Sequence, residues 1–194
     1  MAGNYGTHRE VLKAVLKVVN KPVLELGAGD YSTPLIHNLL KDRRIPIVTI
    51  DHDRVWLSKY EEFKTKYHSF LKISRNEDLM KYFEEDKTDW GLVFIDNGSW
   101  RMRYEAVRRY SQTADYIVLH DCDYFPDNGL FGKTLRKDTD KRHGARWYGD
   151  MFVNWIELVI RYWVPGSPPT LLGSNKHKLD ELIFENMLVC NKSK

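Results

Sequence analysis

Short apolar runs alternate with amphipathic segments along the first 120 residues of the chain, at intervals of about 20–25 residues. Continuous apolar runs of this kind are typical of strands that are buried on both faces, as in a parallel sheet. The runs lie at residues 22–26, 46–50, 70–74, 91–95 and 116–119. Their alternation with helical segments predicts an α/β fold built on a doubly wound sheet.

The segments between these runs carry apolar or aromatic residues at helical spacing. Thr7 and Glu10 have the spacing of a capping box at the start of the first helix. Thr33 and Pro34 predict the N-cap and the first helical position of the second helix. Two more helices are predicted, one from the spacing of Trp56, Tyr60, Phe63 and Tyr67 and one from Trp100, Tyr104 and Val107.

The regular alternation ends after Asp121. Residues 122–150 combine turn residues, mixed charge and scattered aromatic residues, which predicts a long loop or a short-helix excursion on the substrate side. Two further strands are predicted at residues 155–164 and 169–174, and residues 179–188 are compatible with a closing helix.

Composition and length are those of one ordinary globular domain. The chain has 194 residues, of which 42% are hydrophobic and 29% charged, which excludes disordered and fibrous classes. We therefore expect a single domain over residues 1–194. Neither a long apolar span nor a hydrophobic N-terminal region is present, so no membrane contact or secretory signal is expected. Two cysteines cannot form a disulfide scaffold, and a cytoplasmic location is the expectation.

Polar side chains follow every one of the five apolar runs. In open α/β sheets, ligands bind outside the carboxyl ends of the strands. The residues at these positions are Gly27, Ala28, Gly29, Asp30, Asp51, His52, Asp53, Arg75, Asn76, Glu77, Asp78, Asp96, Asn97, His120 and Asp121. One edge of the sheet is therefore predicted to carry the chemistry.

Residues 23–32, Val-Leu-Glu-Leu-Gly-Ala-Gly-Asp-Tyr-Ser, resemble motif I of the class I S-adenosylmethionine (SAM)-dependent methyltransferases. The resemblance implies a Rossmann-like sheet of seven strands in the order 3-2-1-4-5-7-6, mostly parallel with strand 7 antiparallel, and SAM as the cofactor. It implies that Glu25 receives the cofactor's ammonium group, directly or through water. It also implies that the turn at Gly27, Gly29 and Ser32 lets the backbone approach the ligand closely.

The same resemblance assigns roles to residues that follow the later strands. Asp51 is expected to accept hydrogen bonds from both ribose hydroxyls, and Asn76 and Asp78 to contact the adenine edge. His52 is expected to stack near the adenine or to face solvent. Asp96 is expected to face the methionine part of the cofactor and the substrate.

A nicotinamide dinucleotide site is the alternative, since it also places an acidic residue about 20 residues after its glycines. Asp51 lies 24 residues beyond Gly27, but Ser32 stands where the third glycine of that motif belongs. Glu25, two residues before the first glycine, also suits a sulfonium amino acid better than a pyrophosphate. The sequence therefore favours SAM.

A distant likeness to the catechol O-methyltransferase family bears on metal binding. In that family, acidic groups after strands 4 and 5 and an asparagine hold magnesium, and Asp96 and Asp121 match the acidic pair. Cys122 stands at the asparagine position and is a poor magnesium ligand. No divalent metal is therefore expected. If one is held, magnesium at Asp96 and Asp121 is implied, with Asp123 as a substitute ligand.

His120 is the main catalytic candidate, together with Asp121 and Asp96. A neutral imidazole can accept a proton from an attacking hydroxyl or amine. The competing interpretation is a structural hydrogen bond from His120 to Asp121 or to the backbone. His8 is assigned to the cap region of the first helix.

The expected function is methyl transfer from SAM to an oxygen or nitrogen of a small-molecule acceptor. Residues 6–10, 118–121 and 168–175 resemble one bacterial group of small methyltransferases of unassigned substrate. A nucleic-acid or protein methyltransferase that uses the basic region 101–146 is the alternative, although a net charge of +3 does not by itself indicate nucleic acid. A non-catalytic SAM-binding protein is a third interpretation.

Residues 133–146 form the most basic part of this region. They are interpreted either as a lid that recognises phosphate or carboxylate or as a solvated loop. Arg101 and Arg103 are expected near the pocket. A homodimer is compatible with the sequence.

Overall fold

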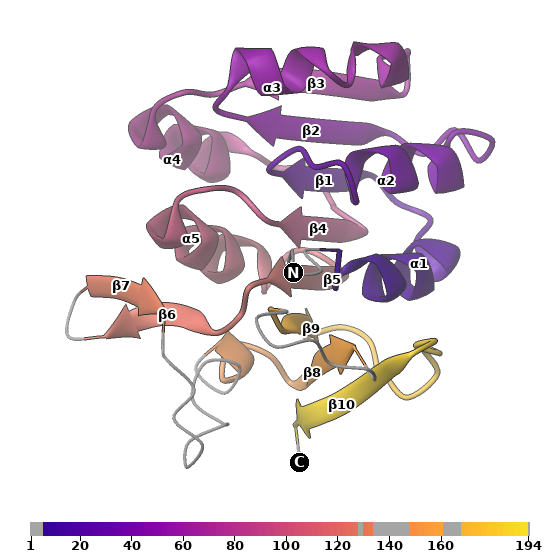
Figure 1. Ribbon diagram of the computed structural model, residues 1–194, viewed down its shortest axis with the longest axis vertical. Helices are drawn as coiled ribbons and strands as arrows, with labels where there is room; N and C mark the ends of the chain where they lie inside the picture. Colours follow the sequence, from indigo (N-terminus) through magenta and orange to yellow (C-terminus); the bar gives the residue numbers. More distant parts are fainter. Residues whose placement is uncertain (1–5, 128–129, 134–147, 161–167, 194) are drawn as a thin grey trace, which may run out of the picture.

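The computed structural model describes residues 6–127, 130–133, 148–160 and 168–193. Its main element is an eight-stranded sheet with the order β3-β2-β1-β4-β5-β9-β8-β10 (Figure 1). The strands are β1 (Val23–Leu26), β2 (Ile47–Asp51), β3 (His68–Lys72), β4 (Leu92–Ile95), β5 (Tyr116–His120), β8 (Asn154–Ile160), β9 (Thr170–Ser174) and β10 (Met187–Lys192).

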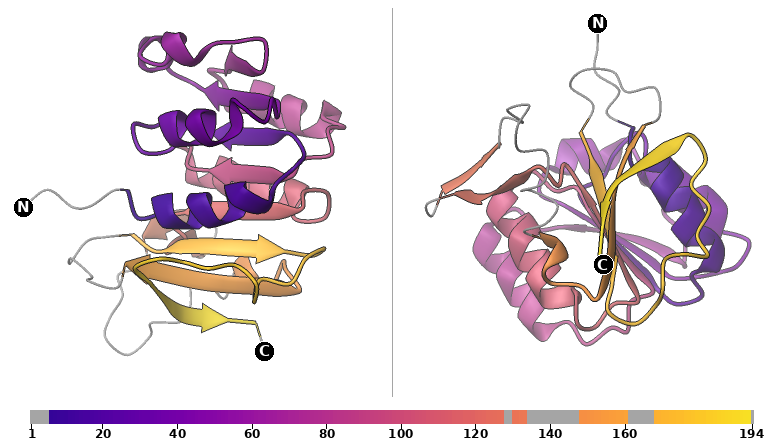
Figure 2. Two further views of the ribbon diagram at one scale, coloured as in Figure 1. Left: turned by 90° about the vertical axis from the view of Figure 1, so that its right-hand side faces the viewer. Right: turned by 90° about the horizontal axis from the view of Figure 1, so that it is seen from below.

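Helices cover both faces of the sheet (Figure 2). One face carries α1 (Arg9–Val18) and α2 (Thr33–Leu40), and the other carries α4 (Asn76–Glu85) and α5 (Trp100–Tyr110). A short helix α3 (Arg54–Ser58) and a 3₁₀ turn η1 (Glu61–Phe63) follow β2. None of the described helices is long and apolar enough to cross a membrane.

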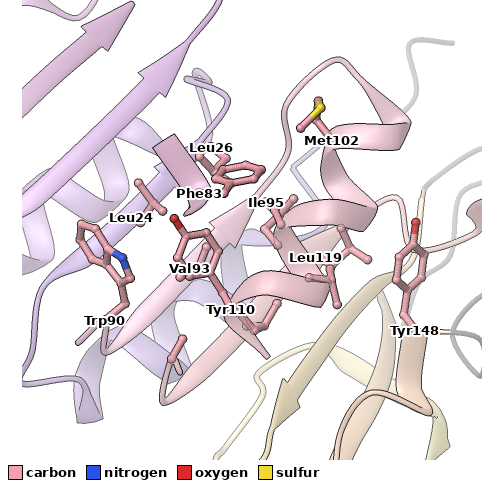
Figure 3. Packing of buried hydrophobic residues seen from close by; sticks show 14 of the residues in the cluster. Leu24, Leu26, Phe83, Trp90, Val93, Ile95, Met102, Tyr110, Leu119 and Tyr148 are labelled. Atoms are coloured by element: carbon pink, nitrogen blue, oxygen red, sulfur yellow. The ribbon is translucent and has the colours of Figure 1, made fainter. Parts of the chain in front are cut away.

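The central strands are buried on both faces, as their continuous apolar runs predict. All four residues of β1 and of β4 are buried. Leu24 and Leu26 of β1, with Val93 and Ile95 of β4, pack against α4 and α5 through Phe83 and Tyr110 among others (Figure 3). Residues at alternate positions face α1 and α2. This packing fixes the register of the strands and therefore the position of every residue at their carboxyl ends.

The predicted topology is confirmed. The strand pairs β1–β2, β1–β4, β2–β3 and β4–β5 are parallel, whereas β9 runs antiparallel to both β5 and β8. Taking β8 and β9 as the sixth and seventh strands gives the predicted order 3-2-1-4-5-7-6. The structure adds an eighth strand, β10, antiparallel to β8 at the edge of the sheet.

The expected closing helix at residues 179–188 was wrong. Its last residues belong to β10, and the chain before that strand forms turns. Asn186 has a φ of 56°, a left-handed conformation that ends any helical path. The free edge of β8 then offers backbone partners to the apolar start of β10.

The helix predicted from Trp56 to Tyr67 is broken into α3 and η1, because tertiary hydrogen bonds hold its aromatic residues. The Trp56 indole N–H donates to the Ala28 carbonyl (2.6 Å), and the Tyr60 hydroxyl donates to Asp30 (2.7 Å). Helix α4 was not predicted at all.

Within residues 122–150 the structure shows a β-hairpin apart from the main sheet, formed by β6 (Tyr124–Asp127) and β7 (Leu130–Lys133). Residues 134–147 lie outside the described part of the chain, so the choice between a lid and a solvated loop stays open for the basic stretch.

Candidate functional site

A cavity of about 290 Å³ lies at the carboxyl edge of the sheet. This volume is at the lower end of the range of small-molecule sites, about 300–1,000 Å³. Its apolar wall comes from Leu26, Ile50, Ile73 and Leu79. Its polar groups include Asp51, His52, Asn76 and Asn97. The cavity therefore combines an apolar slot with a few polar groups, at the edge where the sequence predicts a ligand.

The loop after β1 is shaped by Gly27, which has a φ of +95°. A Cβ atom at Gly27 would lie 2.6 Å from the backbone carbonyl of Asp96, so a larger residue does not fit between the ends of β1 and β4. The Gly27 N–H donates to the Ile50 carbonyl at 2.8 Å. The glycine of the motif is therefore needed for packing of the strand ends.

Asp51 ends β2 and is nearly buried, with an exposed fraction of 8%. Its carboxylate accepts the backbone N–H groups of Ala28 and Asp53, both at 2.9 Å. His52 Nδ1 lies 3.2 Å from the same carboxylate, and the His52 ring is largely exposed. A carboxylate has about four acceptor positions, so Asp51 is held in one orientation while it keeps acceptor capacity towards the cavity.

Glu25 lies behind this loop and does not line the cavity. It is completely buried, and its carboxylate accepts hydrogen bonds from Thr33 (3.0 Å) and Thr49 (2.6 Å). Burial raises the pKa of Glu25 to about 7, although hydrogen bonds from Ser32, Thr49 and Thr33 act in the opposite direction. Its position is that of a support for the loop.

The polar contacts continue from Glu25 into the protein. The Thr49 hydroxyl lies 2.8 Å from Nε2 of His68, whose Nδ1 lies 3.2 Å from Nδ1 of His37. Because the Thr49 hydroxyl donates to Glu25, it accepts from His68 Nε2–H, and His68 Nδ1 accepts from His37. We call Glu25, Thr33, Thr49 and His68 the Glu25 cluster.

The remaining cofactor candidates divide into two groups. Asn76 and His52 line the cavity. Asp78 does not line it, because its exposed carboxylate forms a two-point ion pair with Arg75, at 2.8 Å for each bond. Ser32 is buried at the N-cap of α2, one position before the expected Thr33, and makes no cap hydrogen bond.

A second group of polar residues lies where β4 and β5 end. His120 Nδ1 is 3.1 Å from Asp96 and 3.6 Å from Asp121. Arg103, a buried residue of α5, bonds to Asp96 (3.0 Å), Asp121 (3.1 Å) and the His120 carbonyl (2.9 Å). The structure therefore brings the three predicted catalytic residues together around one guanidinium, and the closer carboxylate of His120 is Asp96.

The N-terminal segment completes this second group. The Thr7 hydroxyl lies 3.0 Å from His120 Nε2, and so it does not cap α1. The His8 ring packs edge-on against the ring of His120, with 4.6 Å between the centroids. The expected capping box is therefore wrong, since the tertiary contact with β5 takes its threonine and Glu10 accepts from Lys13 instead. We call Thr7, His8, Asp96, Arg103, His120 and Asp121 the His120 cluster.

Burial and pairing move the pKa values of this cluster in different directions. Burial lowers the pKa of His120, but the hydrogen bond and charge of Asp96 outweigh it, and the pKa is raised overall. Burial favours a higher pKa for Asp96, yet the hydrogen bond and charge of His120 lower it. Burial, with the charge of His120, lowers the pKa of His8 to about 3. His8 is thus a neutral imidazole at physiological pH.

Sequence reasoning missed the roles of Thr7, His8 and Arg103. The signal for the first two was the segment 6–10, which the resemblance includes but which we interpreted as a helix cap. Arg103 was expected near the pocket, and its Nε donates to the carbonyl of Asn97 in the cavity wall, but its burial between two carboxylates was not expected. Cys122, at the position of the metal-binding asparagine of the catechol O-methyltransferase family, is completely buried in the apolar core.

No protein-family model and no curated protein sequence matches the chain. Solved structures do match its fold. An O-methyltransferase from Bacillus cereus, in complex with S-adenosylhomocysteine (SAH), aligns with a TM-score of 0.57 and 13% identity over 89% of this chain and 80% of its own. An S-adenosylmethionine-dependent methyltransferase from Clostridium acetobutylicum aligns with a TM-score of 0.50 and 10% identity, over 90% of this chain and 92% of its own.

These likenesses establish the fold. The chain has the fold of the class I SAM-dependent methyltransferases, as the motif at residues 23–32 implies.

Proposed function

We propose that the protein is a SAM-dependent methyltransferase. The observation that carries the proposal is the cavity at the carboxyl edge, with Asp51 held by two backbone N–H groups in its wall. The amide oxygen of Asn97, also in the wall, is buried and has no hydrogen-bond partner among the described residues. A bound adenosine would satisfy both groups, since it carries hydroxyl and amino donors.

Different lining residues contact different parts of the cofactor in this proposal. Asp51 accepts hydrogen bonds from the ribose hydroxyls. Leu26, Ile50 and Leu79 cover the adenine base, and Asn76 lies at its edge. When bound, SAM supplies a methyl group that its sulfonium already activates, so the protein has mainly to align the acceptor and exclude water. We assign Glu25 the support of the loop, because it is buried behind it with its oxygens bonded to hydroxyls.

The acceptor side of the site is assigned to the His120 cluster. Asp96 directly precedes Asn97 of the cavity wall, so the reacting centre lies where the cavity meets this cluster. Asp96 accepts the His120 Nδ1–H, which leaves Nε2 as the basic nitrogen of the neutral ring. A hydroxyl acceptor that takes the place of the Thr7 hydroxyl would lose its proton to this nitrogen.

A small-molecule acceptor, methylated at oxygen or nitrogen, is proposed over nucleic acid. Three of the four described arginines of the basic region bond within the chain: Arg103 in its ion pairs, Arg108 with Glu105 at the surface, and Arg109 with two backbone carbonyls, whereas Arg101 is exposed. We therefore expect only weak RNA binding at physiological salt. Tight binding that weakens steeply as salt rises would instead favour a nucleic-acid acceptor.

Calorimetry with the purified chain tests the cofactor assignment. SAM and SAH should bind with micromolar affinity, and NADH should not bind comparably. Binding of NADH without binding of SAM would overturn the proposal. Release of SAH in the presence of a panel of small hydroxyl and amine compounds then separates an enzyme from a non-catalytic binding protein.

A matched pair of carboxylate variants locates the cofactor. Asp51→Ala removes hydrogen bonds to ribose, each worth about 1.5–3 kcal/mol when one partner is charged, so SAM affinity should fall at least tenfold. Asp78→Ala removes a carboxylate that pairs with Arg75 at the surface, and affinity should change less than about twofold. Equal effects of the two substitutions would place the cofactor elsewhere.

A further inference from the structure

His8 is the least satisfied polar residue of the His120 cluster. It is 3% exposed, and neither of its ring nitrogens has a hydrogen-bond partner among the described residues. Its ring lies between Phe94 (4.9 Å between centroids) and His120. Leaving buried polar atoms unpaired costs free energy, and each such group in a native structure calls for a specific reason, such as a bound ion.

The neighbours of His8 provide the other donors of an ion site. One ligand atom each from His8, Asp96 and His120 lie within 4.8 Å of one another. These atoms come from three separate parts of the fold, namely the start of α1 and the ends of β4 and β5. Two imidazoles and one carboxylate brought together from such distant positions form a typical set of three protein ligands.

We propose that His8, Asp96 and His120 bind a divalent transition-metal ion of the zinc class. Imidazole nitrogen suits zinc, copper, iron and nickel, whereas magnesium prefers oxygen ligands. The site differs in ligands and in metal from the magnesium pair that the resemblance implies for Asp96 and Asp121. Three protein ligands also leave a coordination position open, as in catalytic rather than structural zinc sites.

The charge around the site favours a cation. Two carboxylates, Asp96 and Asp121, share the single guanidinium of Arg103, so the cluster carries one net negative charge when both histidines are neutral. The Asp96 side chain keeps 24% of its surface exposed, which gives an ion a route from solvent. Asp121 lies 3.6 Å from His120 Nδ1, next to one of the ligands, where carboxylates commonly orient metal-bound histidines.

Binding of a metal ion at His120 requires the loss of a hydrogen bond. His120 bonds to Asp96 through Nδ1 and to Thr7 through Nε2, so one of these hydrogen bonds must be exchanged for the ion. In the metal-bound protein His120 is a ligand, and its role as a proton acceptor belongs to the metal-free protein. The metal proposal itself needs only the donor set and does not depend on methyl transfer.

Metal binding by the purified full chain, stripped with a chelator, tests the proposal. We expect one Zn²⁺ per chain by calorimetry, and visible absorption bands of low-symmetry coordination when Co²⁺ is added. His8→Ala should weaken Zn²⁺ binding by about 100-fold or more and abolish the cobalt bands. His177→Ala is the matched control, because its half-exposed ring stacks on Tyr116 at the opposite end of β5, and it should leave both signals unchanged.

His8→Phe separates metal binding from folding. The variant keeps a ring against Phe94 and His120 and removes the two unpaired nitrogens, so its melting temperature without metal should equal or exceed that of the wild type. Zn²⁺ should raise the melting temperature of the wild type and leave that of His8→Phe unchanged. The proposal is overturned if the wild type binds no stoichiometric Zn²⁺, or if His8→Ala and the wild type bind it equally. Neither result would affect SAM binding at the cavity.

Discussion

Two buried polar clusters lie under the same edge of the sheet, and they differ in completeness. Each combines a carboxylate, an imidazole and a threonine hydroxyl. In the Glu25 cluster, between β1 and β2, the carboxylate, hydroxyls and imidazole all have partners. In the His120 cluster, between β4 and β5, His8 has none among the described residues. The hydroxyl of Thr170, the register partner of His120 in β9, also lacks a hydrogen-bond partner within the described part of the chain.

Backbone conformation and exposure separate the two clusters further. Asp121 has a φ of 53°, in the left-handed region that non-glycine residues adopt rarely, and its carboxylate thereby lies against Arg103. Asp96 and Asp121 stay partly exposed, whereas Glu25 is sealed. A closed network rigidifies the fold, while strain, unpaired groups and exposure are typical of a place where a ligand arrives. We therefore propose a structural role for the Glu25 cluster and a role in ligand binding or catalysis for the His120 cluster.

The largest expected effect is that of His120→Ala on turnover. Loss of the imidazole as a general base should lower methyl transfer to a hydroxyl acceptor by the metal-free protein by about 10²–10⁴-fold. Cofactor affinity, set by the cavity at β2, should stay nearly constant. The measurement is SAH release together with calorimetry on the same samples. Unimpaired turnover would remove His120 from the reaction centre.

Glu25→Gln tests the closed cluster through the pH dependence of stability. The folded pKa of about 7 exceeds the usual 4.5, so the folded state holds its proton more tightly than the unfolded chain does. This contribution is fully present below pH 4.5 and is lost as the pH rises through 7. Relative to the glutamine variant, the wild type should lose about 3 kcal/mol of unfolding free energy across that window.

Denaturant titrations of both proteins at several pH values measure this difference. Groups outside the Glu25 cluster with shifted pKa values, such as His8 at about 3, titrate in both proteins and therefore cancel in the comparison. A difference between the two proteins that does not change with pH would show that Glu25 is not a sealed carboxylate.

Gly27→Ala tests the contact that joins the two clusters. Its Cβ would lie 2.6 Å from the Asp96 carbonyl, and its φ of +95° is unfavourable for alanine. We expect a loss of about 2 kcal/mol or more in unfolding free energy. At Gly98 the nearest atom to an added Cβ is 3.8 Å away, so Gly98→Ala should change stability by less than about 0.5 kcal/mol. Equal losses in the two variants would contradict the close approach of the strand ends.

Much of this architecture was predictable because it depends on local pattern. The five apolar runs predict the five parallel strands to within about two residues. Central strands buried on both faces need continuous apolar sequence, whereas β3 at the edge of the sheet is largely exposed. The edge of the sheet that gathers Asp51, Asp96 and His120 follows from the same register. Helix α4 was missed because packing against α5 decides that segment. The closing helix was wrong because its last residues pair with β8 as part of β10.

The sequence by itself determined the fold class and the edge at which polar residues collect, because hydrophobic periodicity and chain connectivity restrict an α/β sheet to few arrangements. The strand order was implied by the resemblance at residues 23–32. Only the tertiary structure decided which polar residues meet. It places Thr7 and His8 against His120, more than a hundred positions away along the chain, and it turns Asp78 away from the cavity. Side-chain direction and long-range contact follow from packing, which no local spacing records.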